Sequence, residues 1–90
     1  MNKYTLVDCW ERNKKHPKTF EIPTKMKLKE LKVGSIVKLI FDDRERMWVE
    51  IMGKRLNTWI GRLDNKPYDL THLKLNDEIE FENKHICEVI

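Results

Sequence analysis

Hydrophobic and polar residues alternate with a period of two over much of the chain after Gly34, and this period is typical of half-buried β-strands. The nearly continuous apolar run from Ile36 to Phe41 is broken by a single lysine. It predicts a central strand that carries Val37, Leu39 and Phe41 on one face.

The stretch from Arg46 to Pro67 continues this pattern and contains the strongest structural signal of the chain. It reads as one strand, a tight turn at a glycine, a second strand and a closing turn. Met47, Val49 and Ile51 fall on one face of the first of these strands. Asn65 tolerates left-handed backbone angles and is therefore expected to form the closing turn.

Two later segments add strands at the C-terminal end. Residues 78–82 predict a strand with an apolar inner face, and residues 85–90 predict a short terminal strand or turn. Residues 31–39 and 73–81 resemble each other, and in each a leucine anchor and a tight turn precede a strand. Five or six short strands joined in this way favour a small, partly open, SH3-like antiparallel barrel.

The first 34 residues predict short helices in place of strands. Asp8 is placed to cap a helix that ends before Pro17, and Thr24 is placed to cap a second helix that Gly34 ends. The expected fold is α+β and mostly β. It is a single domain over 1–90, with an irregular or helical basic segment over 1–34 and a β-barrel core over 35–90.

The charge distribution is uneven, although the net charge is only +3. Between Arg12 and Lys38 there are nine lysines or arginines and two glutamates. Between Asp77 and Glu88 there are five acidic residues and one lysine. The two segments either neutralise each other or form solvated surfaces. Alternatively, the basic segment is an electrostatic contact surface for an acidic protein or a nucleic acid.

Composition excludes several classes of protein. With 40% hydrophobic and 37% charged residues, and only three glycines and three prolines, the chain is neither collagen-like nor of low complexity. No apolar run is long enough to span a bilayer and no secretory leader is evident, so no membrane association and a cytoplasmic location are expected. Cys9 and Cys87 are expected to be buried thiols, with a disulfide between the chain ends as the alternative.

Several motifs resemble those of the YegJ-like bacterial domain of unknown function, in the same order from about residue 16 to the C-terminus. They are His16-Pro17-Lys18-Thr19-Phe20, Leu31-Lys32-Val33-Gly34, Val37-Lys38-Leu39-Ile40-Phe41, Arg46-Met47-Trp48-Val49, Gly61-Arg62-Leu63-Asp64-Asn65-Lys66-Pro67 and Phe81 with His85-Ile86. Asn76 stands where the resemblance leads us to expect glycine. The resemblance implies a bacterial or phage origin and a compact α+β domain, and it supplies no catalytic residue.

No catalytic constellation is evident from the residues themselves. The three histidines are scattered, and no pair of acids has an interpretable spacing. Cys9, His16, His85 and Cys87 offer a zinc set in principle, but histidines beside apolar strands are more often structural. We therefore expect no catalytic residue, no metal ligand and no cofactor.

The candidate binding residues are basic or aromatic. Trp59 shares a face with Gly61, so pairing of the two strands can set a tryptophan over this glycine. Alternatively, Trp48 is partly exposed near Arg46 and Arg62, where it can serve as a contact platform. Trp10 adjoins the basic segment and offers a second anchor. The predicted binding set is Trp10, Arg12, Lys14, Lys15, Lys18, Lys25, Lys27, Trp48 and Arg62.

These observations favour a non-catalytic binding module that contacts another protein through its basic N-terminal face and an exposed aromatic residue. A nucleic-acid-binding barrel is the first alternative, with Lys29 added to the phosphate contacts and Trp48 or Trp59 stacking on bases. A small inhibitor, immunity protein or phage counter-defence protein that acts by occlusion is the second.

Overall fold

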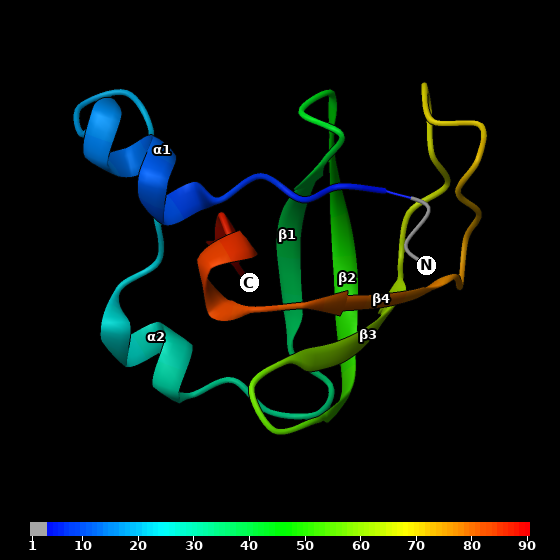
Figure 1. The fold of residues 1–90 in the computed structure, drawn as a ribbon. Coiled ribbons are helices and arrows are strands. Elements are labelled where there is room, and N and C mark those ends of the chain that lie inside the picture. The colour runs from blue at the N-terminus through cyan, green and yellow to red at the C-terminus, as the bar shows by residue number, and fades with distance from the viewer. Residues whose placement is uncertain (1–3) are drawn as a thin grey trace.

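A computed structural model describes residues 4–90, and the first three residues of the predicted 1–34 segment lie outside this range. Two short helices are followed by a β-rich remainder (Figure 1). The elements in chain order are α1 (Cys9–Lys15), α2 (Lys25–Lys29), β1 (Ile36–Phe41), β2 (Glu45–Lys54), β3 (Trp59–Leu63), β4 (Glu78–Phe81), the 3-10 helix η1 (Asn83–His85) and β5 (Glu88–Val89).

Both helices begin where the capping residues predict. The Asp8 carboxylate accepts a hydrogen bond from the N–H of Glu11 at 3.0 Å, and the Thr24 hydroxyl accepts one from the N–H of Lys27 at 3.2 Å. Both predicted helical segments are therefore confirmed, although α2 ends at Lys29, before Gly34. Within residues 4–90, no helix is long and apolar enough to cross a membrane.

The five strands form one antiparallel sheet in the order β4-β3-β2-β1-β5. The first four strands make a meander, and β5 returns to the free side of β1, where Val37 pairs with Val89. The α+β, mostly β class is confirmed. Because the strand order is linear, β4 and β5 form two edges and the sheet does not close into a barrel.

One face of the sheet forms the main hydrophobic core. The alternation in β1 and β2 is as predicted, since these inward side chains are almost fully buried: Val37, Leu39, Phe41, Met47, Val49 and Ile51. The two leucine anchors of the internal repeat, Leu31 and Leu73, are buried in the same core. Each leucine therefore fixes the turn that precedes its strand.

The turns of that repeat share an unusual backbone conformation. Gly34 has a φ of +96° and Asn76 a φ of +75°, so asparagine occupies the left-handed position where the resemblance leads us to expect glycine. Asn65 lies in the closing turn after β3, as predicted, but its φ is not positive. Its side-chain oxygen instead accepts a hydrogen bond from the backbone N–H of Trp48 and so attaches the closing turn to β2.

A smaller hydrophobic cluster joins the two ends of the chain. It contains Cys9 at the start of α1, Phe20 after that helix, Ile40 of β1 and Cys87 beside β5. Both cysteines are buried free thiols, which confirms the expectation from the sequence. This cluster fixes α1 against the sheet edge and thereby sets the position of Trp10.

Candidate binding site

Two adjoining hollows are lined by α1, α2, η1 and the hairpin that joins β2 to β3. Their volumes are about 290 and 470 Å³, and both are lined by Trp10, Lys54, Trp59 and Asn83. We call the two hollows together the tryptophan groove. The remaining lining residues are Lys25, Leu28, Lys29, Leu31, Leu56, Asn57, Glu82 and Lys84.

Trp59 is held in the groove by two polar contacts. Its indole Nε1 donates a hydrogen bond to Oδ1 of Asn83, in η1, at 2.8 Å. Lys54 is the strand partner of Trp59 across the β2–β3 hairpin, and the Lys54 Nζ lies 4.8 Å from the centroid of the Trp59 ring. The ring is therefore fixed in orientation, with a cation over one face.

Trp10 is the more accessible of the two tryptophans. It is 41% exposed and follows directly after Cys9, which is fully buried. The buried cysteine orients the first turn of α1 so that Trp10 lines the groove. Leu28 and Leu31 supply apolar lining on the α2 side, and Leu31 belongs to the main core.

The charge of the groove is strongly positive. Four lysines line it, namely Lys25, Lys29, Lys54 and Lys84, against the single carboxylate of Glu82. Among residues 4–90, none of these four lysines forms an ion pair. The groove thus combines unneutralised cations with two aromatic rings.

The structure separates the predicted binding residues into several places. Trp10 and Lys25 lie in the tryptophan groove. Lys18 and Lys27 line a different hollow beside β5, and Lys14 and Lys15 are exposed at the end of α1, outside both hollows of the groove. The basic segment is therefore divided between surfaces.

The other three predicted residues are engaged within the protein. Arg12 forms an ion pair of 2.9 Å with Asp43, and Arg62 forms one of 2.6 Å with Glu50. The third residue, Trp48, is half-buried on β2. The Lys38 Nζ lies 4.4 Å from the centroid of the Trp48 ring. Trp48 does not pack over Gly61, whose nearest side chains are those of Val49 and Phe81.

Sequence reasoning did not single out Lys54, Lys84 or Asn83 as groove residues. Lys54 could have been predicted, because hairpin pairing places it opposite Trp59. Asn83 and Lys84 belong to η1, which approaches the hairpin only through the tertiary fold. No local pattern of residues marks such a contact.

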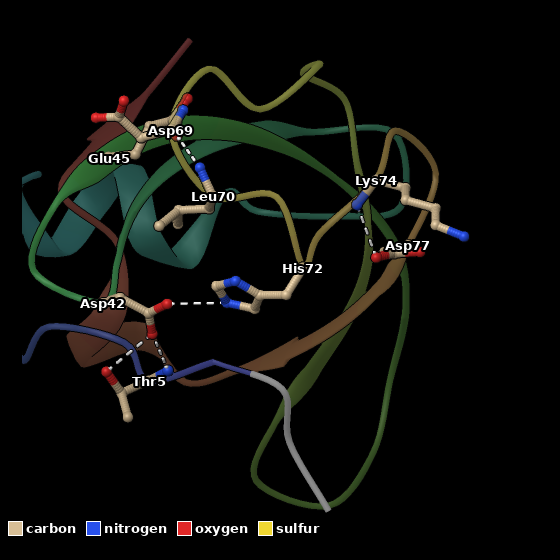
Figure 2. Close-up of polar contacts among 8 residues, drawn as sticks. All are labelled: Thr5, Asp42, Glu45, Asp69, Leu70, His72, Lys74 and Asp77. Carbon is tan, nitrogen blue, oxygen red and sulfur yellow. Dashed lines mark hydrogen bonds and ion pairs between the residues drawn. The ribbon is translucent and has the colours of Figure 1, made fainter.

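A polar cluster attaches the N-terminal segment to the rest of the molecule (Figure 2). The Asp42 carboxylate accepts hydrogen bonds from the Thr5 N–H at 2.7 Å and the Thr5 hydroxyl at 3.3 Å, and it pairs with the His72 Nε2 at 3.0 Å. The Thr5 N–H bond chiefly holds the pKa of Asp42 below its usual value. The carboxylate separates the hydroxyl from the imidazole, so the cluster is not a nucleophile and base pair.

A second carboxylate holds the loop between β3 and β4. Glu45 accepts hydrogen bonds from the backbone N–H groups of Tyr68, Asp69 and Leu70 at 2.6, 2.9 and 3.3 Å. Burial raises the pKa of Glu45, but the three donors outweigh it and the pKa lies below its usual value. The loop is thereby pinned to the start of β2 (Figure 2).

The zinc set considered from the sequence is not assembled. Among residues 4–90, no group of three or more histidine, cysteine or acidic side chains is arranged to hold a metal ion. His16 is exposed beyond α1, while the His85 Nδ1 accepts a hydrogen bond from the N–H of Glu82 at 2.9 Å. The histidine near Cys87 therefore serves to close η1.

No family model, no curated protein and no solved structure matches the chain. The YegJ-like resemblance therefore stays a prediction. The tryptophan groove is the feature of the structure that indicates a binding function.

Proposed function

We propose that the protein is a non-catalytic module that binds an acidic segment of a partner protein in the tryptophan groove. The observation that carries the proposal is the presence, around Trp10 and Trp59, of four lysines that form no ion pair with the carboxylates of residues 4–90. Aspartates or glutamates of the segment would pair with these lysines. An aliphatic side chain between them would contact Trp10 and Leu28.

The position of Lys54 favours a protein ligand over a nucleic acid. Base stacking requires an open aromatic face, but Lys54 lies over Trp59 and Lys38 lies over Trp48. Of the two tryptophans in the groove, Trp10 has no cation over its ring among residues 4–90. Carboxylates can pair with Lys54 while it stays over the indole, so binding of an acidic segment does not require an open ring face.

We also propose that the sheet is a partly open, SH3-like barrel. In Figure 1, β4 runs steeply across the direction of β1 and β2, which supports a partly wrapped sheet. The four-strand meander of short strands also supports it. The tryptophan groove would then lie at one end of an incomplete barrel, beside the helices.

The test uses a synthetic peptide in which several glutamates flank a single leucine, with binding followed by isothermal titration calorimetry. The groove variant replaces Lys25 and Lys29 with alanine, and the matched control replaces Lys14 and Lys15, which are exposed at the end of α1. A second groove variant is Trp10→Ala. Oligothymidylate at the same salt concentration serves as the competing probe.

We expect the wild type to bind the peptide and the Lys25 and Lys29 double variant to bind at least about tenfold more weakly. Trp10→Ala should weaken binding to a similar degree because it removes the accessible aromatic contact. The Lys14 and Lys15 variant should bind as the wild type does. Equal affinity of the groove variant and the wild type would overturn the proposal, and tighter binding of oligothymidylate would favour the nucleic-acid alternative.

A further inference from the structure

A separate hollow of about 430 Å³ opens between β5 and the segment of residues 18–23, and its lining includes Cys87. Three cationic side chains line the same hollow, those of Lys18, Lys27 and Arg46. Two carboxylates, Glu21 and Glu88, oppose them. Glu88 is also paired with Lys38, whose Nζ lies 4.0 Å from its carboxylate, so the hollow keeps an excess of positive charge.

Cys87 lies in the same buried cluster as the second thiol of the chain, that of Cys9. Cys9 is fully buried, with its Sγ 3.5 Å from the carbonyl oxygen of His85. Cys87 is 4% exposed, and of the two thiols it is the one that lines the hollow.

The surroundings of the two thiols differ in their effect on ionisation. The neighbouring thiol, together with burial, raises the pKa of Cys9, and the Cys9 thiol lowers the pKa of Cys87. Arg46 also favours the Cys87 thiolate. The Arg46 guanidinium lies 5.6 Å from the centroid of the Phe20 ring and forms no ion pair within residues 4–90.

We propose that Cys87 is a site of thiol–disulfide exchange with small disulfides that enter this hollow, and that Cys9 is its resolving thiol. A lowered pKa and cationic neighbours favour the reactive thiolate of a cysteine. Cys87 is mostly buried, and it reaches solvent only where it lines the hollow. A second thiol in the same cluster is what converts a mixed disulfide into an intramolecular one.

The reaction proceeds in two exchanges. Cys87 first loses its proton to solvent. Its thiolate attacks one sulfur of the small disulfide, a Cys87–sulfur bond forms, the original sulfur–sulfur bond breaks, and the first small thiolate leaves and takes up a proton from solvent. Cys9 then attacks the Cys87 sulfur, and the second small thiol leaves with the Cys9 proton. Two protein thiols are oxidised to one disulfide, and one small disulfide is reduced to two thiols.

The disulfide would link the first residue of α1 to the residue that precedes β5. It would therefore fix the end of the helix that carries Trp10.

The experiment treats the folded protein with glutathione disulfide and follows its mass. We expect the wild type to lose two hydrogen atoms per chain, and peptide mapping should locate one bond between Cys9 and Cys87. Cys9→Ala should stop at the mixed disulfide and gain one glutathionyl group on Cys87. Cys87→Ala should stay unmodified in the folded state, because Cys9 is enclosed.

Arg46→Met tests the environment of the thiol, with Arg44→Met in the exposed β1–β2 turn as the matched control. We expect the Arg46 variant to react at least about threefold more slowly and the Arg44 variant to react at the wild-type rate. Two results would overturn the proposal. One is wild-type protein that keeps both thiols after treatment, a readout that requires no variant to fold. The other is modification of Cys87→Ala as fast as of Cys9→Ala.

Discussion

The indole Nε1 of Trp59 donates a hydrogen bond of 2.8 Å to Oδ1 of Asn83, and this bond joins the start of β3 to η1 across 24 residues of sequence. Asn83→Ala removes the acceptor from a partly buried donor, so we expect a loss of about 1 kcal/mol in the free energy of unfolding. Denaturant unfolding measures this, and the NMR resonance of the Trp59 indole proton should shift. Asn57→Ala, in the exposed hairpin turn, is the control and should leave the free energy of unfolding unchanged.

Gly61 lies where two neighbouring side chains leave no room for a methyl group. A Cβ at this position would overlap with the Val49 Cγ1 and would lie 3.1 Å from the Phe81 Cε1. We expect Gly61→Ala to destabilise the protein by about 2 kcal/mol or more, because β2 and β4 would have to move apart. Gly53→Ala is the matched control, since among residues 4–90 no heavy atom beyond its two chain neighbours lies within 4 Å of its Cβ position. Equal stabilities of the two variants would contradict this account of the packing.

The cost of a side chain at Gly34 has a different origin. Its φ of +96° is unfavourable for any L-residue, while the space around its Cβ position is open. Gly34→Ala should therefore lower the stability by about 1 kcal/mol through backbone strain alone. Thermal unfolding of Gly34→Ala beside Gly53→Ala isolates this effect. An unchanged melting temperature for the Gly34 variant would show that the turn relaxes at no cost.

Acid should weaken the attachment of the loop between β3 and β4. The pKa of Glu45 is lower in the folded state than its ordinary value of 4.5, so its stabilising contribution is present above that value. The contribution is lost as the pH falls through the lower folded pKa, when the carboxylate takes up a proton and ceases to be a charged acceptor. We expect the free energy of unfolding to fall below about pH 4.5.

Glu45→Gln is the variant that tests this explanation. It should lose about 1 kcal/mol at pH 7, where the wild-type carboxylate is charged, and should respond less steeply to acid. Glu30→Gln, exposed at the end of α2, is the control and should keep the acid response of the wild type. If Glu45→Gln and the wild type have the same pH profile, the loop is held by other contacts.

Local patterns predicted the parts of the fold that local chemistry determines. The caps at Asp8 and Thr24 and the inward faces of β1 and β2 follow from residue type and spacing, and all are confirmed. Asn65 shows the limit of such reasoning. Its residue type suits a left-handed turn, but the fold uses its side chain to bind the N–H of Trp48.

The candidate site was predicted less completely, because it depends on contacts between distant segments. Trp10 and Lys25 were selected for their charge and aromatic character, and both lie in the tryptophan groove. Arg12 and Arg62 were selected on the same grounds, but each forms an ion pair with an acidic residue of another segment. Which basic residues remain without partners is decided only when the chain folds.

The pairing of β1 protects the most apolar strand of the molecule. One edge of this strand is filled by β2, and the other is divided between the two ends of the chain. Glu88 and Val89 pair with its first half, while Leu6 bridges to Phe41 at its far end. An exposed edge of such a sequence is a template for aggregation with other copies of the chain. By completing the same edge, the two terminal segments remove β1 as a template for such pairing.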